Sequence, residues 1–408
     1  MKICLLATAT PRHQTGGTEI HAETLARFAA ARGHEVYWLT SSRPEGAETE
    51  ERDGYRLFYL PGTDYRMSRR SAPVWWRESF KKINELRESG GLDVIWAENL
   101  TGQYYAAFAQ AGDRVPLISI IQGPGIRGEI LSNWNRAASA KEFLWFFTRY
   151  AAQTLFYFIP WFRRVMRNSD RIVTISDECV SALSREFPGS IDKISKIYDF
   201  VDTSVFRPDA GLREAARRSM GIRPDEKALI MAGVAHRQKG FHIGINAFEL
   251  LRREVPGARL IIAGDGPELG GLKALVSGKG LADAVVFRGR VEHGELPALY
   301  NAADLHLNPT LRFEGLALVI PEAMACGLPC VVSRIGGTGS TIEDGRSGFF
   351  TRPGDAAGMA EKAAALLKDP ALAAAMGRAA RERALREFSE KNIDSYIELS
   401  AELIKAGK

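Results

Sequence analysis

Two glutamates, Glu314 and Glu322, stand eight residues apart in an apolar, glycine-containing segment of this 408-residue chain. Pro321 lies between them and fits only the first turn of a helix, so we expect Glu314 just before a helix and Glu322 in its first turn or so. A carboxylate accepts two hydroxyl hydrogen bonds well, which makes a diol such as ribose or a hexose a natural partner. For an isolated pair, two solvated glutamates are the alternative interpretation.

The elements that must position this pair follow a regular alternation that restarts after Pro208. Short apolar runs predict strands at residues 3–7, 35–39, 56–60, 93–96, 116–121 and 171–175, then at 228–231, 259–263, 285–287, 305–307 and 329–332. Helical spacing is found at residues 18–32, 74–89, 101–110, 240–255, 269–277, 295–301 and 318–326, with a helical end from 356 to 408. This order predicts two doubly wound α/β halves with parallel sheets, joined near residues 200–210.

Glycine-rich turns follow several of the predicted strands. They are Gly16-Gly17, Gly264-Asp265-Gly266-Pro267 and Gly336-Gly337. Ligands bind at the carboxyl ends of parallel strands, where backbone N–H groups favour phosphate, so such turns in both halves indicate a phosphate ligand between them. The sequence Gly123-Pro124-Gly125-Ile126-Arg127-Gly128 also fits Gly-x-Gly-x-x-Gly. Since its proline interrupts the motif and we expect no clean helix start there, a nicotinamide site is not favoured.

Composition excludes several other classes of protein. With 45% hydrophobic and 25% charged residues and a net charge of +5, the chain is typical of a soluble globular protein and gives no argument for nucleic acid. The longest charge-free apolar stretch, between Arg149 and Arg163, is too short to span a membrane. Four cysteines form no disulfide framework and no zinc cluster.

The amino terminus allows two interpretations. Lys2 followed by an apolar run and Ala7-Thr8-Ala9 is similar to a signal peptide, but the run has the minimum length and a glycine pair soon opens a helical pattern. We therefore expect a buried first strand and a cytoplasmic protein.

Residues 314–322 resemble the Glu-x7-Glu motif of the retaining glycosyltransferases of family 4. Further matches follow in the family's order at residues 16–19, 31–36, 170–176, 201–208, 239–240, 264–267, 302–304 and 336–337. The resemblance implies the GT-B fold, in which two Rossmann-like, doubly wound α/β domains face each other across a cleft. The expected domains are 1–203 for the acceptor, 204–386 for the nucleotide sugar, and a C-terminal helix at 387–408 that packs back on the first domain.

The resemblance also implies roles for individual residues. Glu322 would hold the ribose of a nucleoside diphosphate sugar, Glu314 would approach the donor sugar, and Lys239 would neutralise the diphosphate. The implied donor-binding set is Gly16, Gly17, Gly233, Arg237, Gly264, Gly266, Gly315, Leu316, Ala317, Leu318 and Glu322. No cofactor is expected, and no metal either, because the sequence contains no Asp-x-Asp pair.

Several positions depart from the family's pattern. They are Gln122 for His, Asp199-Phe200 for Asn-Gly, Val234 for Arg, Ala317 for Gly and Ser340 for an acid. Gln122 stays a catalytic candidate that can bind a sugar but cannot carry a proton at neutral pH. His236 or Arg237 could replace the charge missing at Val234. These changes affect the acceptor side and the donor geometry more than the class.

The segment 134–167 combines aromatic and basic residues. It contains Trp134, Phe143, Trp145, Phe146, Phe147, Tyr150, Phe156, Tyr157, Phe158, Trp161 and Phe162, then Arg163, Arg164 and Arg167. One interpretation is a helix buried against the first sheet. The other is a contact with an anionic membrane surface, supported by a second cluster of Arg66, Arg69 and Arg70 near Trp75-Trp76.

The sequence thus predicts a hexosyltransferase-type enzyme that transfers a sugar with retention to a glycan or lipid-linked acceptor, in glycan, polysaccharide or glycolipid biosynthesis. It would be cytoplasmic, or peripheral on the inner face of the membrane. A nucleotide-sugar epimerase on the same fold and a non-catalytic sugar-binding protein are the alternatives.

Overall fold

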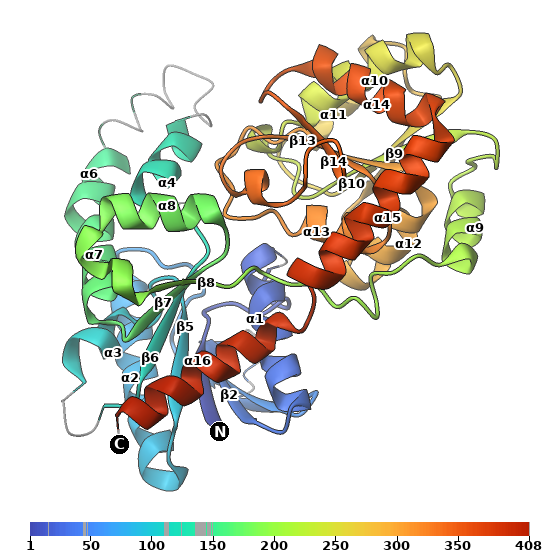
Figure 1. Ribbon diagram of the computed structural model, residues 1–408. Helices are drawn as coiled ribbons and strands as arrows, with labels where there is room; N and C mark the ends of the chain where they lie inside the picture. The colour runs from blue at the N-terminus through green and yellow to red at the C-terminus, as the bar shows by residue number, and fades with distance from the viewer. Residues whose placement is uncertain are drawn as a thin grey trace. The chain divides into compact units, whose positions relative to one another are not determined.

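The computed structural model describes residues 1–14, 16–43, 46, 48–109, 114–123, 125–134, 144, 148 and 150–407. These residues divide into two compact units (Figure 1). The first unit contains the described residues of 1–129, 137–199 and 390–408, and the second contains those of 130–136 and 200–389. Each unit has its own largely parallel sheet with helices, which confirms the predicted α/β class.

The sheet of the first unit has eight strands among the described residues, in the order β3-β4-β2-β1-β5-β6-β7-β8. Their bounds are β1 Lys2–Leu6, β2 Glu35–Ser41, β3 Thr49–Arg52, β4 Tyr55–Leu60, β5 Val94–Glu98, β6 Leu117–Ile121, β7 Arg171–Thr174 and β8 Ile194–Lys196. All neighbours are parallel except β3 and β4. Because β1 pairs with both β2 and β5, the chain winds outward in both directions from the middle, as a doubly wound sheet requires.

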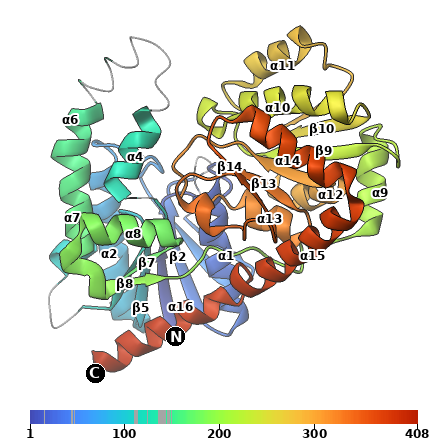
Figure 2. The same cartoon turned by 45° about the horizontal axis from the view of Figure 1, so that its top comes forward.

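Helices connect these strands. Their bounds are α1 Gly17–Ala31, α2 Ala72–Gly90, α3 Gln103–Phe108, α4 Gly125–Trp134, α6 Ala151–Gln153, the π-helical turn η3 Thr154–Phe158, α7 Ile159–Asn168, α8 Asp177–Glu186, the 3₁₀ segment η4 Pro188–Lys193 and α16 Asn392–Ala406. The helix α16, at the end of the chain, lies beside α1 (Figure 2). Trp96 donates its indole N–H to Ser400 Oγ over 3.0 Å, and Arg32 pairs with Asp394. These contacts tie α16 to the first unit.

The second unit contains a six-stranded parallel sheet within its described residues, in the order β11-β10-β9-β12-β13-β14. The strands are β9 Lys227–Ala232, β10 Ala258–Ala263, β11 Val285–Gly289, β12 Leu305–Asn308, β13 Cys330–Ser333 and β14 Gly348–Thr351. The helices are α9 Ala210–Ser219, α10 Phe241–Glu254, α11 Leu269–Gly278, α12 Leu296–Ala302, α13 Val319–Ala325, α14 Ala356–Lys368 and α15 Pro370–Glu387, with 3₁₀ segments η5 Arg237–Lys239, η6 His293–Glu295 and η7 Gly337–Ser340.

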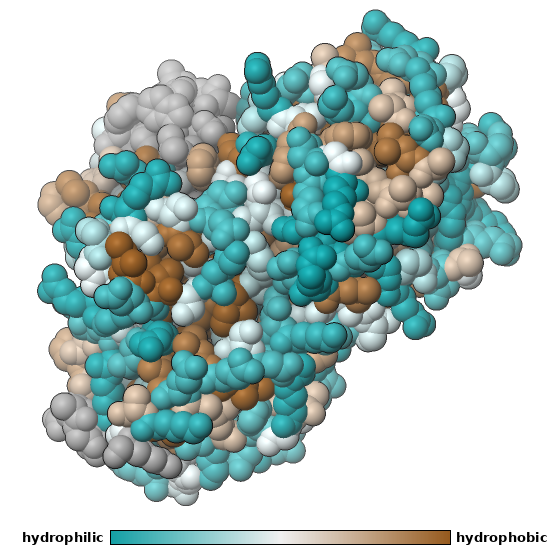
Figure 3. All heavy atoms as spheres, in the orientation of Figure 1, coloured by the Kyte–Doolittle hydropathy of each residue, from teal (hydrophilic) through white to brown (hydrophobic). Residues whose placement is uncertain are grey.

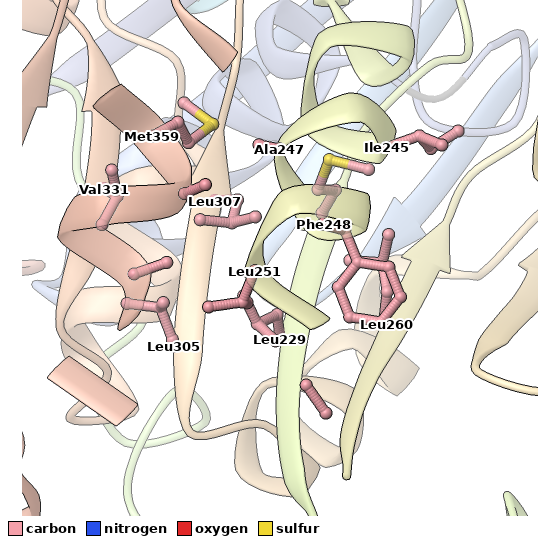
Figure 4. Close-up of a cluster of buried hydrophobic side chains, with 14 of the residues drawn as sticks. Leu229, Ile245, Ala247, Phe248, Leu251, Leu260, Leu305, Leu307, Val331 and Met359 are labelled. Atoms are coloured by element: carbon pink, nitrogen blue, oxygen red, sulfur yellow. The ribbon is translucent and has the colours of Figure 1, made fainter. Parts of the chain in front are cut away.

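The core of the second unit forms where helices cover this sheet. Figure 4 shows Phe248 and Leu251 of α10 against Leu229 and Leu260 of neighbouring strands. All four side chains are almost fully buried. Burying side chains of this size contributes about 1.5–3 kcal/mol each, so the core fixes the strand ends that carry the loops of the site.

The structure differs from the elements predicted from the sequence in two respects. The strands β3, β8 and β14 were not predicted, since β3 is polar throughout and all three are short and lie at or near a sheet edge. A helix also starts at Gly125, where none was expected. Gly125 has φ +75°, and the N–H groups of Ile126 and Arg127 donate to the Glu186 carboxylate over 2.7 and 2.9 Å. That distant carboxylate supplies the cap that the local sequence lacks.

None of the helices that the structure describes has the length and hydrophobicity of a membrane-spanning segment.

Candidate functional site

The second unit brings Lys239 and Glu314 together. Lys239 ends η5, and Glu314 lies in the loop between β12 and α13. Their Nζ and Oε1 atoms are 2.6 Å apart, and Thr310 donates its hydroxyl to the same oxygen over 3.2 Å. Gly240 has φ +69°, and a Cβ there would meet the Pro309 carbonyl oxygen at 1.9 Å. Only glycine therefore allows the end of η5 to lie this close to the start of the loop that carries Glu314.

The charge of Glu314 follows from these contacts. Its burial would raise the pKa of the carboxyl, but the cations of Lys239 and Arg312 and the hydrogen bonds from Lys239 and Thr310 outweigh burial and lower the pKa below its usual value. Glu314 is thus a buried carboxylate at neutral pH, and Lys239 has a quarter of its side chain exposed. The pair presents a partly accessible ammonium group beside a fixed anion.

The loop after Glu314 presents backbone donors. Among the described residues, the N–H groups of Leu316, Ala317 and Leu318 donate no hydrogen bond. Ala317 has φ +73°, in the left-handed region that glycine favours. Successive N–H groups around a left-handed residue form a concavity that suits an anion. The loop therefore offers backbone donors beside an alanine in a strained conformation, and donor binding by residues 315–318 stays a prediction.

The glycine pair 336–337 fixes the backbone of this loop. Gly337 donates its N–H to the Glu314 carbonyl over 2.8 Å, and Gly336 pairs with Glu314 in an isolated parallel bridge. A Cβ on Gly336, which has φ +57°, would lie 2.8 Å from that carbonyl oxygen. The pair is thus needed for the close approach of two backbone segments, a role that was not predicted from the sequence.

Glu322 lies in the first turn of α13, as predicted, and both of its oxygens have protein partners. Oε1 is 2.8 Å from His293 Nε2, and Oε2 accepts the Tyr300 hydroxyl over 2.9 Å. His293 and Tyr300 were not predicted from the sequence. Neither belongs to a motif around Glu322, and the three elements meet only in the fold.

The other predicted glycines of the second unit hold two loops together. A Cβ on Gly264 would meet the Gly233 carbonyl oxygen at 1.8 Å, and one on Gly266 would meet that of Ala235 at 2.7 Å. These glycines have strongly positive φ values, and the loops after β9 and β10 are in direct backbone-to-backbone contact at these positions. The side chain of Arg237 is exposed and forms no ion pair with a described residue, and Val234 is exposed too.

In the first unit, Gln122 follows β6 and contacts a buried histidine. Its amide nitrogen is 2.7 Å from His21 Nδ1, which also lies 2.8 Å from Glu98 Oε1. His21 Nε2 is 3.2 Å from Asp199 Oδ1. The four side chains come from α1 and from the ends of three parallel strands, so they meet at the carboxyl edge of the sheet. Of these four residues, only Gln122 was predicted from the sequence as a site residue.

This cluster carries a buried cation. Burial alone would lower the pKa of His21, but Asp199 and Glu98 outweigh it and raise the pKa to about 9. Burial also raises the pKa of Asp199, to about 6. At neutral pH an imidazolium therefore stands behind Gln122, between two acidic groups.

The glycine pair 16–17 starts α1, and its turn holds a carboxylate of the chain itself. Glu19 lies in the first turn, accepts a hydrogen bond from Gln14 Nε2 over 2.7 Å, and would be 2.6 Å from a Cβ on Gly16. Burial raises the pKa of Glu19. Donor binding by Gly16 and Gly17 stays a prediction, and a phosphate there would compete with Glu19.

The aromatic and basic segment is partly described. Phe143, Trp145, Phe146 and Phe147 lie outside the described residues. In α7, Phe162, Val165 and Met166 are buried while Arg163, Arg164 and Arg167 are exposed, and Leu155 and Phe156 of η3 are 58% and 69% exposed. The helix thus packs on the sheet along one side and shows cations on the other.

The predicted cluster of Arg66, Arg69 and Arg70 with Trp75 and Trp76 was wrong for the two tryptophans. Trp75 and Trp76 are buried, and their indole N–H groups donate to backbone carbonyls of Thr101 and Leu100. Arg69 lies instead over the ring of Tyr157, with its Cζ 4.5 Å from the centroid. The described residues also include no group of three or more His, Cys, Asp or Glu side chains that could hold a metal ion.

Comparison with known proteins covers nearly the whole chain. Residues 15–205 match the family described as "Glycosyltransferase Family 4", and residues 213–383 match "Glycosyl transferases group 1". The chain is 27% identical to N-acetyl-alpha-D-glucosaminyl L-malate synthase of Bacillus anthracis over 100% of this chain and 99% of that protein. It is 34% identical to a GDP-mannose-dependent alpha-(1-6)-phosphatidylinositol monomannoside mannosyltransferase of Mycolicibacterium smegmatis, over 55% of this chain and 59% of that protein.

Solved structures show the same fold. Sucrose-phosphate synthase from Thermosynechococcus elongatus superposes with a TM-score of 0.79 at 21% identity, over 100% of both chains. HepE from Anabaena, in complex with UDP-glucose, gives a TM-score of 0.74 at 20% identity, again over 100% of both chains. The two α/β units and the two family matches agree, and the chain belongs to the family 4, group 1 glycosyltransferases of GT-B fold.

Proposed function

We propose that this glycosyltransferase moves a sugar from a nucleoside diphosphate sugar to an acceptor hydroxyl, with retention of configuration, in the assembly of a glycan, polysaccharide or glycolipid. The observation that carries the proposal is the group in the second unit: the Lys239–Glu314 pair, the donor amides of residues 316–318 and Glu322. A related GDP-mannose-dependent enzyme and the UDP-glucose complex of HepE support a nucleotide sugar as donor.

Lys239 and the loop amides would hold the diphosphate. An ammonium group has three N–H donors, and Glu314 accepts one of them, so two remain for phosphate oxygens. The N–H groups of Leu316, Ala317 and Leu318 add donors already fixed in place. Negative charge grows on the diphosphate as the glycosidic bond breaks, and preorganised donors stabilise that charge most in the transition state.

Transfer would take place on one face of the sugar. The bond from the anomeric carbon to the phosphate oxygen breaks, and the acceptor oxygen forms its bond on the same face. The acceptor's proton passes to an oxygen of the leaving phosphate. Glu314, whose pKa lies below its usual value, cannot donate a proton at neutral pH and instead accepts hydrogen bonds from hydroxyls of the donor sugar.

Glu322 would bind the ribose. Its carboxylate is buried, fixed by two hydrogen bonds, and still has lone pairs for hydroxyl donors.

The acceptor is proposed to bind at the first unit, at Gln122. The side chain lies at the carboxyl edge of the sheet, where ligands of parallel sheets bind, and its amide group lies against the ring of His21. An amide can donate to or accept from a sugar hydroxyl.

A lipid-linked acceptor suits the exposed surface of the first unit around α6 and α7, which shows apolar side chains (Figure 3). Leu155 and Phe156 could enter an interface, and the exposed arginines 163, 164 and 167 would attract anionic headgroups. We therefore propose a cytoplasmic enzyme that binds peripherally to the inner face of the membrane.

A panel of nucleotide sugars tests the function. Saturating donor should raise the melting temperature, since stabilisation grows with the logarithm of concentration over dissociation constant. With the selected donor, proton NMR should show product with the donor's anomeric configuration. Binding without turnover would favour the non-catalytic alternative, and release of an epimerised free sugar without any acceptor would favour an epimerase. Stabilisation by none of the donors would contradict the proposal.

A further inference from the structure

The carboxylate of Glu322 is held from two sides by side chains of two other elements. His293, the first residue of η6, lies 2.8 Å from Oε1, and Tyr300 of α12 donates to Oε2 over 2.9 Å. Tyr300 is fully buried, while the side chains of His293 and Glu322 are 30% and 4% exposed. The histidine is therefore the partner that lies nearer to solvent.

Ring packing keeps both donors in place. The ring of Phe206 is 5.2 Å from that of His293 and 6.2 Å from that of Tyr300, and His306 lies edge-on to Tyr300 at 6.0 Å. The turn that carries His293 is fixed by a capping box between Glu292 and Glu295. These neighbouring rings restrict the rotation of both donors.

The geometry limits what Glu322 can still accept. Each carboxylate oxygen has two lone-pair positions, and one on each oxygen is used by the protein. One position on each oxygen remains, which matches the two hydroxyl donors of a ribose. A carboxylate free to rotate would lose entropy on binding, whereas this one is already ordered.

We propose that His293, together with Tyr300, is a positioning residue that orients Glu322 so that the site selects nucleotides with an intact ribose. The inference rests on the proposed function, in which Glu322 binds the ribose. The selected ligand class is the ribonucleoside diphosphate, and the disfavoured class is the dideoxynucleoside diphosphate. The two residues act through Glu322 and need not touch the nucleotide themselves.

The test compares matched ligands by calorimetry. UDP, GDP and ADP are each titrated beside their 2′,3′-dideoxy forms into the full-length wild type, His293→Phe, His293→Gln and Tyr300→Phe. His293→Phe keeps a ring against Phe206 but removes the donor, and His293→Gln keeps a donor. Circular dichroism melts show whether each variant is folded.

For the ribonucleotide that binds, the wild type should prefer it to the dideoxy form by about tenfold or more, the scale of hydrogen bonds to a charged group. His293→Phe should reduce this preference to within about threefold by weakening the ribonucleotide alone, and His293→Gln should restore most of it. Tyr300→Phe should act like His293→Phe.

Two other outcomes have different meanings. If His293→Phe weakens both ligand forms by the same factor, the histidine is only structural and the inference is wrong, while the proposed function stands. If the wild type binds none of the three ribonucleotides, or binds them no better than the dideoxy forms, the role proposed for Glu322 fails and the inference fails with it.

Discussion

Replacing Lys239 by methionine should separate the stability of the second unit from its chemistry. The substitution keeps an unbranched stem but removes the terminal cation 2.6 Å from Glu314, a buried carboxylate. Leaving one partner of a buried ion pair unpaired costs about 3–5 kcal/mol, and we expect the lower end, because Lys239 is a quarter exposed and Thr310 still donates to Glu314. Turnover should fall by about a hundredfold or more.

The loss of stability should depend on pH. Glu314 has a pKa below its ordinary 4.5, so in the wild type its pairing stabilises the fold above that pH and less as the pH falls through the folded value. In Lys239→Met this contribution is missing. The difference in unfolding free energy between the two proteins should therefore be largest near neutral pH and shrink as the pH falls and Glu314 becomes protonated, first in the variant and then in the wild type.

A second variant removes the unpaired charge. Lys239→Met combined with Glu314→Gln leaves no buried carboxylate alone, so it should regain most of the stability without regaining activity. Glu314→Gln alone is the matched control. Urea unfolding followed by circular dichroism reports both units. Tryptophan fluorescence reports chiefly the first, since five of the seven tryptophans are described residues of that unit. Full turnover by Lys239→Met, or a double variant with restored turnover, would refute the role of Lys239.

Three further predictions concern other parts of the molecule. Ala317→Gly should raise stability by about 0.5–1 kcal/mol, as relief of left-handed strain exceeds the added chain entropy. The pKa of His21 is raised from 6.5 to about 9, so its charge stabilises the fold fully below pH 6.5, and this stabilisation is lost as the pH rises through 9. The loss of unfolding free energy, measured by urea unfolding with fluorescence detection, should reach about 3 kcal/mol. Replacing Arg163, Arg164 and Arg167 by Ser should weaken co-sedimentation with anionic vesicles, most at low salt, by about 1 kcal/mol for each arginine.

Each of these has a contrary result. A less stable Ala317→Gly would show that the left-handed backbone carries no strain. Fluorescence-detected stability that stays constant or rises between pH 6.5 and 9 would show that His21 is not charged. The control for the vesicle test is a variant in which serine replaces three exposed arginines of the second unit, Arg218, Arg223 and Arg290. A wild type that does not bind vesicles at low salt would leave the segment as a helix packed on the sheet.

Local patterns accounted for much of the fold. Apolar runs and helical spacing placed most strands and helices, and Pro321 placed the start of α13 and hence Glu322. The polar strand β3 has no such signal, because it is an antiparallel edge that buries little. The start of α4 depends on a carboxylate 60 residues away, which no local pattern contains.

The site was predictable only where a motif is continuous along the chain. Glu314 and the loop after it belong to one segment, whereas Lys239 is 75 residues from its partner and was identified by resemblance. His21 and Glu98 are 77 residues apart, and they meet only because β5 ends beside α1 in the folded sheet. Gln122, identified as a departure from the family, lies against His21 of that buried pair.

The most direct test of the account measures nucleotide affinity at Glu322. Calorimetric titration with the nucleoside diphosphate that stabilises the wild type should show that Glu322→Ala binds about tenfold or more weakly, equivalent to about 1–3 kcal/mol. Glu361→Ala, which removes an exposed glutamate of α14, is the control and should bind as the wild type does. Equal affinity of the wild type and Glu322→Ala would contradict the central claim that this carboxylate holds the donor nucleotide.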